Sequence, residues 1–247
     1  MTISLSAQNV RGLLLDIEGT TTPIAFVYDV LFPFARAHVK DYLSRQLASD
    51  EVRLDVERLR EEHAKDVVGG LSPPPITASP ELESIVGYVN WLMDRDRKST
   101  GLKSLQGKIW EEGYRSGALK SEVFPDVPVA LERWHKAGLK VAIFSSGSVL
   151  AQKLLFSHTI AGNLMNFIDA YFDTTTGPKT AAESYHRISA ELQLNPTQLL
   201  FISDITAELE AATQTGVQSA LCIRPGNAPQ PKADEQRFIR SFDEVND

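Results

Sequence analysis

The sequence predicts an α/β protein in which a doubly wound parallel sheet forms the core and a helical cap domain is inserted. Three short apolar runs, each followed by a helical pattern, indicate the strands of this sheet; they cover residues 12–15, 139–144 and 199–202. Strands that alternate with helices are typical of a parallel sheet, whose ligand site lies beyond the carboxyl ends of the strands. A length of 247 residues leaves room for such a core and a smaller second domain.

The insertion is indicated by the loss of strand patterns between residues 25 and 120. Amphipathic helical patterns replace them, for example at residues 28–47 and 51–63. A break rich in glycine and proline at residues 69–75 divides this region, and the prolines within residues 125–128 mark the return to the core. We therefore expect a core of residues 1–24 and 121–247 and a cap of residues 25–120.

The charge balance argues against two classes of partner. Lysine and arginine number 25 against 32 aspartates and glutamates, a net charge of −7, and no local basic patch is evident. We therefore expect neither nucleic acid nor an anionic membrane as a partner. Residues 1–10 lack the pattern of a signal peptide, and no apolar run approaches the ~20 residues of a membrane span. These features predict a cytoplasmic protein.

The sequence indicates no disulfide, zinc site or nucleotide-binding loop. The single cysteine, Cys222, lies in an apolar stretch and is interpreted as a buried structural thiol. The five histidines are scattered without the close spacing of a zinc site. Residues 101–108 are superficially similar to a P-loop, but the spacing is one residue too long and Ile109 stands where serine or threonine is required.

Two carboxylates follow the first predicted strand. Asp16 ends this strand, and Glu18 lies two residues further along, before Gly19 and Thr20. Such a pair suits phosphoryl transfer, because one carboxylate can act as a nucleophile when a divalent cation screens it, while the other exchanges protons with the leaving group. The alternative interpretation is a solvated loop with a helix-capping aspartate.

Polar residues at the other strand ends favour the chemical interpretation. Ser145 and Ser146 offer hydrogen-bond donors for phosphate oxygens. Lys179 offers a cation, and Asp204 offers a hard oxygen ligand for magnesium. Taken singly, these residues also fit a helix cap, a surface charge and a loop position. Their joint occurrence in order, each at a strand end or a nearby loop, predicts one site at the carboxyl edge of the sheet.

The order of these residues resembles the four motifs of the haloacid dehalogenase superfamily of phosphohydrolases. More specifically, the chain resembles the acireductone synthases, the enolase-phosphatase family of methionine salvage. The segments that carry this resemblance are residues 16–24, residues 144–148, and residues 171–174 with Gly177 and Lys179. The resemblance runs through essentially the whole chain and includes residues 224–227.

The resemblance implies a helical cap over the active site and one Mg²⁺ ion per chain, held around Asp16, Glu18 and Asp204. In the superfamily, the second acidic residue often gives the metal its backbone carbonyl and keeps its carboxylate for proton transfer. Most phosphatases of the superfamily have aspartate there, whereas Glu18 matches the enolase-phosphatase pattern. Glu208, four residues after Asp204, is a candidate second carboxylate near the metal.

The resemblance also implies a reaction on a small phosphorylated diketone. It would convert 2,3-diketo-5-methylthiopentyl 1-phosphate into an enol and then remove the phosphate to leave an acireductone, 1,2-dihydroxy-3-keto-5-methylthiopentene. Asp16 would form an aspartyl-phosphate, and Glu18 would move protons. The phosphate would be bound by Ser145, Ser146 and Lys179. Apolar cap residues could form a surface for the methylthio tail, although most are expected to be cap core: Phe26, Phe32, Phe34, Trp91, Met93 and Trp110.

Three alternatives remain open. The first is a phosphatase or phosphomutase of the same superfamily that acts on another small phosphorylated metabolite. The second is a metal-free dehalogenase, which would leave Glu18 and Asp204 without a purpose. The third is a catalytically silent binding module, against which the presence of the nucleophile, Lys179 and both metal-site acids argues. Nothing in the sequence requires more than a monomer.

Overall fold

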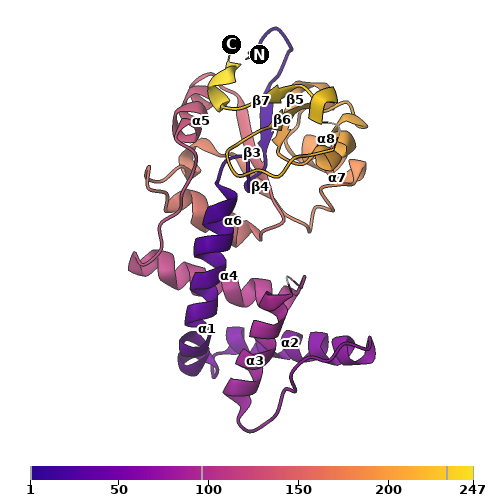
Figure 1. Cartoon of the computed structure of the whole chain (residues 1–247). Coiled ribbons are helices and arrows are strands. Elements are labelled where there is room, and N and C mark those ends of the chain that lie inside the picture. The colour runs from indigo at the N-terminus through magenta and orange to yellow at the C-terminus, as the bar shows by residue number, and fades with distance from the viewer. Residues whose placement is uncertain (1, 96, 232, 247) are drawn as a thin grey trace. The chain divides into compact units, whose positions relative to one another are not determined.

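The computed structural model describes residues 2–95, 97–231 and 233–246, and the chain divides into two compact units (Figure 1). The core unit comprises Met1–Val27 and Lys120–Asp247, and the helical unit comprises Tyr28–Leu119. The helical unit is thus a single insertion into the chain of the core unit.

A six-stranded parallel sheet forms the centre of the core unit, in the order β4-β3-β2-β5-β6-β7. Its strands are β2 (Gly12–Leu15), β3 (Lys140–Phe144), β4 (Ala170–Phe172), β5 (Leu199–Ser203), β6 (Gln218–Cys222) and β7 (Phe238–Ile239). β2 and β5 are buried along their whole length, as expected for strands covered on both faces. The predicted α/β class with a parallel sheet is therefore confirmed. A separate parallel pair joins β1 (Ile3–Ser4) to β8 (Val245–Asn246).

Among the described residues of the core unit, four α-helices lie between the strands along the chain. They are α5 (Asp126–Lys136), α6 (Val149–Ser157), α7 (Ala182–Glu191) and α8 (Thr206–Thr213). Figure 1 shows α5 on one side of the sheet and α7 and α8 on the other. On the latter side the ring of Tyr185 packs against Phe144 and Phe201, with centroid distances of 5.7 and 5.2 Å. These rings belong to a buried apolar cluster that ties α7 and α8 to the strands.

The strand order places a topological switch point between β2 and β5. After β2 the chain returns to the sheet as β3 on one side of β2, whereas after β5 it continues to β6 on the other side. β2 and β5 are hydrogen-bonded neighbours, with Leu15 opposite Ile202 in register. In open α/β sheets, ligands bind in the crevice that such diverging connections leave at the carboxyl ends of the strands. Asp16 and Ser203 lie at this position.

In the described residues of the helical unit, four α-helices surround a buried apolar centre. After a π-helical turn (Phe26–Leu31), which begins in the core unit, the helices are α1 (Phe32–Gln46), α2 (Asp50–Val68), α3 (Glu81–Asp94) and α4 (Thr100–Ser116). Serine side chains cap α2 and α4, where Ser49 and Ser99 accept hydrogen bonds from amides of the first turn. The buried carboxylate of Asp55 pairs with Lys108, so the charge that α2 places inside the unit is neutralised by α4.

Three further predictions concern residues outside the sheet centre. Residues 101–108 lie within α4, so no strand-to-helix phosphate loop exists there. Cys222 is buried at the end of β6 and forms no disulfide. In the part of the chain that the structure describes, no helix is long and apolar enough to cross a bilayer.

Candidate active site

Asp16 lies at the carboxyl end of the central strand β2, with only 5% of its surface exposed. Its amide donates to the carbonyl of Ile202 at 3.0 Å, which continues the β2–β5 ladder by one residue. Its carboxylate accepts a hydrogen bond from the amide of Ile17 at 2.7 Å. The sheet therefore fixes both the backbone and the side chain of this residue.

Lys179 pairs directly with Asp16. The ammonium nitrogen lies 2.6 Å from Asp16 Oδ1 and 2.7 Å from Glu208 Oε2. Burial disfavours the charged ammonium, but the negative charges of Asp16 and Glu208 outweigh this effect, so the pKa of Lys179 is raised above its ordinary value. Lys179 is therefore a buried permanent cation beside the carboxylate of Asp16.

The loop that carries Lys179 is held by the first turn of α7. Tyr185 donates its hydroxyl to the carbonyl of Lys179 at 2.6 Å, and Ser184 donates to the carbonyl of Pro178 at 2.7 Å. Gly177 has a φ of 141°, and a Cβ there would lie 2.4 Å from Ser184 Oγ. Only glycine tolerates both conditions, which explains why this residue precedes the lysine loop.

Ser203 and Glu208 complete the network on the β5 side. Ser203 Oγ lies 2.8 Å from Glu208 Oε2 and 3.3 Å from Asp16 Oδ2. Burial, with the charge of Asp16 next in importance, raises the pKa of Glu208, while Lys179 opposes the shift. Sequence reasoning left the role of Glu208 open and did not assign Ser203 to the site. Its position immediately before Asp204 was the available signal.

Asp204 follows β5 and is 5% exposed. Burial and the charge of Asp16 raise its pKa to about 7. Among the described residues, no lysine or arginine forms an ion pair with its carboxylate. The buried acids Asp16 and Asp204 and the half-buried Glu208 thus lie around one cation, Lys179, and this excess of negative charge suits a divalent cation.

The donor set fits magnesium better than a metal that needs a protein cage. No three His, Cys, Asp or Glu side chains in the described ranges form a ready-made metal cluster. Mg²⁺ usually takes one or two carboxylates and completes its shell with water and substrate phosphate. The carboxylates of Asp16 and Asp204, at the ends of two adjacent strands, meet that requirement.

Glu18 is half-buried on the loop that leaves β2. It forms an isolated bridge with Thr22, so the chain folds back on itself within five residues. The amides of Thr20, Thr21 and Thr22 all donate to the carbonyl of Ile17. This tight turn restrains the backbone of Glu18, which lies two residues after Asp16.

Ser145 and Ser146 follow β3, which is the neighbour of β2 with Leu15 opposite Ile143. Ser145 is buried and accepts a hydrogen bond from the amide of Gly147 at 3.2 Å, whereas Ser146 is exposed. The N-cap of the following helix α6 is Ser148, so capping does not explain the two earlier serines. The register places Ser145 and Ser146 at the same sheet edge as Asp16.

Of the predicted site residues, Asp16 and Lys179 are thus in direct contact, and Asp204 lies close enough for its charge to interact with Asp16. Glu18, Ser145 and Ser146 belong to loops at the same edge of the sheet. The arrangement offers an anchored carboxylate, a buried cation and a second acid on an adjacent loop. These groups are what an in-line phosphoryl transfer to a carboxylate needs.

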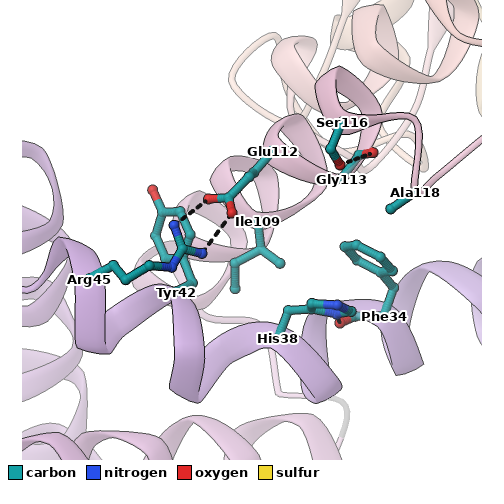
Figure 2. Close-up of a pocket in the computed structure, with 9 residues that line it drawn as sticks. All are labelled: Phe34, His38, Tyr42, Arg45, Ile109, Glu112, Gly113, Ser116 and Ala118. Atoms are coloured by element: carbon teal, nitrogen blue, oxygen red, sulfur yellow. Dashed lines mark hydrogen bonds and ion pairs between the residues drawn. The ribbon is translucent and has the colours of Figure 1, made fainter.

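The helical unit contains a separate pocket, between α1 and α4 (Figure 2). Phe34 stacks on His38 at one end, and at the other Arg45 lies 2.6 Å from Glu112. Among the candidates for the methylthio tail, Phe34 lines this pocket. Phe26, Trp91 and Trp110 are buried, in keeping with their expected role as core residues.

The sequence matches the family model described as haloacid dehalogenase-like hydrolase over residues 10–216. It is 53% identical over 237 residues to the Enolase-phosphatase E1 of Synechococcus elongatus, covering 96% of this chain and 98% of that relative. A longer relative from Sorghum bicolor carries the name "Probable bifunctional methylthioribulose-1-phosphate dehydratase/enolase-phosphatase E1". It is 45% identical, over 97% of this chain and 48% of the relative.

A crystal structure of the UTR4 protein of Saccharomyces cerevisiae has a similar fold, with a TM-score of 0.77 and 33% sequence identity. The match covers 94% of this chain and 98% of that chain. The CbbY protein of Rhodobacter sphaeroides, solved with phosphate, has a TM-score of 0.54 at 16% identity, which supports the fold alone.

Proposed function

The chain belongs to the haloacid dehalogenase-like hydrolase family and, within it, to the enolase-phosphatases, and from this premise we propose its substrate and the roles of its residues. Magnesium dependence is typical of the family. We propose one Mg²⁺ ion per chain, in accord with the two strand-end carboxylates of Asp16 and Asp204. The monomeric state and cytoplasmic location expected from the sequence remain predictions.

The proposed substrate is 2,3-diketo-5-methylthiopentyl 1-phosphate. The name of the Sorghum relative joins a methylthioribulose-1-phosphate dehydratase to an enolase-phosphatase, and this chain matches about half of that protein. Loss of water from methylthioribulose 1-phosphate gives this diketone, so the pairing of activities supports it as the compound that the enolase-phosphatase half receives.

Enolisation is the first proposed step. The carboxylate of Glu18 takes a proton from C1, whose acidity is increased by the adjacent carbonyl group, and the C1–H electron pair becomes the C1–C2 double bond as the carbonyl oxygen at C2 gains negative charge. The proton then passes to that oxygen to give the enol phosphate. The position of Glu18 on the tight turn after Asp16 supports this role.

Phosphoryl transfer follows at the same site. A carboxylate oxygen of Asp16 attacks phosphorus, the bond between phosphorus and the C1 oxygen breaks, and that oxygen receives a proton from Glu18, which has regained one from solvent after enolisation. Water then gives a proton to the Glu18 carboxylate as its oxygen attacks the phosphorus of the aspartyl-phosphate, which releases phosphate and restores the carboxylate of Asp16; Glu18 returns that proton to solvent. The sum of the two steps consumes one water and gives the acireductone and phosphate.

The remaining residues are proposed to bind the phosphoryl group and the magnesium ion. Lys179 and the donors at Ser145 and Ser146 hold the oxygens of the transferring phosphoryl group. Asp16 and Asp204 would hold magnesium by their carboxylates and Glu18 by its backbone carbonyl. When bound, the ion screens the negative charges of nucleophile and phosphate from one another.

The observation that carries this proposal is the 53% identity, over nearly the full length of both chains, to a protein named as an enolase-phosphatase. The test is proton and phosphorus NMR of the diketone phosphate with enzyme and Mg²⁺. We expect the C1 protons to change first and inorganic phosphate to follow. In Asp16→Asn, phosphate release should fall by at least ~10³-fold while the protein stays folded, because an amide is a poor nucleophile. Release of phosphate without an enol would instead indicate an ordinary phosphatase.

A further inference from the structure

The loop that follows Asp16 is held by residues from the far end of the chain. Its backbone carbonyls accept hydrogen bonds from several directions. Those of Gly19, Thr20 and Thr21 are bound by Asn227 Nδ2 at 3.0 Å, by Arg224 Nε at 3.2 Å and by the amide of Phe124 at 3.0 Å, in that order. These three donors belong to segments 103 or more residues away in the sequence, so the loop is set by long-range contacts.

Gly19 is the most restricted residue of this loop. Its φ is 69°, its amide donates to the carbonyl of Thr22 at 2.8 Å, and its carbonyl is bound by Asn227. A Cβ at this position would lie 2.5 Å from Asp204 Oδ2 and 2.8 Å from Asn227 Oδ1. With both of its peptide groups held, Gly19 fixes the direction of the peptide that links it to Glu18.

Asn227 is itself anchored. Its Nδ2 also donates to the carbonyl of Cys222 at 3.1 Å, at the end of β6, and its amide donates to the carbonyl of Arg224 at 3.2 Å. Its Oδ1 is buried and has no hydrogen-bond partner among the described residues. The side chain is therefore clamped between the sheet and the Gly19 carbonyl, with an unused acceptor next to Gly19 and close to Asp204.

Arg224, which binds the Thr20 carbonyl, supports the same arrangement. Its guanidinium is buried, pairs with both oxygens of Asp126 at 3.0 and 2.8 Å, and lies over the rings of Phe124 and Phe242. A bidentate, stacked arginine has little freedom to move. Because Asn227 follows Arg224 by three residues, this anchor also fixes where the asparagine can reach.

We propose that Asn227 is a positioning residue: by binding the Gly19 carbonyl, in the peptide that follows Gly19, it restrains the backbone of Gly19 and through it the preceding Glu18–Gly19 peptide, and so tunes both the affinity for the divalent cation and proton transfer by Glu18. The proposal rests on the function proposed above, because it takes Glu18 and the cation as parts of that site. Asn227 acts through Gly19 and does not contact the reacting atoms.

The test compares Asn227→Ala with Asn195→Ala. Asn195 is a matched control because its side chain caps a short helix in the core unit and is not part of the site. Mg²⁺ is titrated calorimetrically into each protein without substrate. For Asn227→Ala we expect the affinity to fall by ~10–100-fold, the usual effect of losing a group that orients a metal site, and no change for Asn195→Ala. Hydrogen exchange at residues 17–22 should quicken in Asn227→Ala alone.

A second variant, Asn227→Leu, keeps the side-chain volume but has no donor, and should give the same loss if Asn227→Ala folds poorly. Steady-state kinetics of these variants should show a lower kcat at saturating Mg²⁺ with little change in KM. The proposal is overturned if a folded Asn227 variant binds Mg²⁺ within twofold of wild type and its residues 17–22 exchange at the wild-type rate. The binding and exchange measurements need no substrate. Failure of the wild-type enzyme to convert the diketone phosphate would therefore overturn only the proposed function.

Discussion

The ammonium nitrogen of Lys179 lies 2.6 Å from Asp16 Oδ1, so the proposed phosphate-binding cation is paired with the proposed nucleophile before a substrate arrives. The ammonium group also forms an ion pair with Glu208, so its position does not depend on Asp16 alone. A phosphate that enters the site therefore meets a cation already held in place by two carboxylates. Preorganised charge of this kind stabilises a transition state because it does not have to reorient during the reaction.

Lys179→Ala should lower kcat/KM by ~10²–10³-fold, about 2.7–4 kcal/mol of transition-state stabilisation, the range for one preorganised donor in a dry site. The measurement is steady-state phosphate release, with vanadate binding as a second readout. Lys153→Ala is the matched control, since that lysine is exposed on α6 and its ammonium group lies over the ring of Tyr171. Vanadate binding unchanged by Lys179→Ala would contradict the assignment.

Glu18→Gln should slow enol formation by ~10²–10⁴-fold, because the amide keeps the side-chain length but loses the titratable group. The measurement is incorporation of solvent deuterium at C1. Asp16→Asn should differ in kind, retaining some exchange at C1 while phosphate release is lost, provided Mg²⁺ still binds. If Glu18→Gln exchanges the C1 proton at the wild-type rate, the base is another group.

Asp126→Asn should destabilise the core unit in a way that depends on pH. Burial favours the neutral form of Asp126, but hydrogen bonds from Arg224 and the amide of Phe242 outweigh it and hold its pKa below the ordinary value. The stabilisation is therefore complete above the unfolded-state pKa of about 3.9 and is lost as pH falls through the lower folded-state pKa. At pH 7 the free energy of unfolding of the variant should be lower by about 3–5 kcal/mol, because the buried Arg224 loses its ion-pair partner.

The difference in the free energy of unfolding between wild type and Asp126→Asn should accordingly become smaller below pH 4. Denaturant unfolding at several pH values measures this difference. Asp94→Asn serves as the control, since Asp94 pairs with Arg36 at the surface and its loss should change stability little at any pH. If the difference in unfolding free energy stays constant from pH 7 to pH 3, the ion pair between Asp126 and Arg224 is not the cause of the destabilisation.

Cys222 should resist alkylation in the native protein. Burial raises the pKa of its thiol to about 12, so the reactive thiolate is scarce at neutral pH. Iodoacetamide at pH 8 should label the denatured protein readily and the native protein slowly, as mass spectrometry would record. Rapid labelling of native protein would mean that the end of β6 opens often.

The sequence was sufficient to predict the centre of the sheet but not its edges. β2, β3 and β5 are continuous apolar runs, which is the pattern of a buried parallel strand. β4 and β7 have only three and two residues, too few for any periodicity to stand out. β6 begins with Gln218 and Ser219, whose polarity hides a strand that is buried only from Ala220 onward.

The same limit applies to the site. Asp16, Glu18 and Asp204 are visible in the sequence because acids directly after apolar strands are conspicuous. Asn227 carries no such signal, since its partner Gly19 is 208 residues away and the contact is made through the backbone. Ser203 donates to Asp16, which is 187 residues away, and in the sequence the adjacent Asp204 is the more conspicuous residue. Local pattern identifies chemical groups, whereas the groups that orient them emerge only from the three-dimensional register.

The hydrogen bond from Phe124 to Thr21 bears on how this enzyme could diversify. It joins the segment that leads into the helical insertion to the segment that leads out of it, and both residues belong to the core unit. The named contacts that shape the loop after Asp16 likewise come from core residues. The hydrogen bonds that shape this loop therefore do not depend on the insertion, so residues 28–119 can change in length and sequence without loss of these contacts.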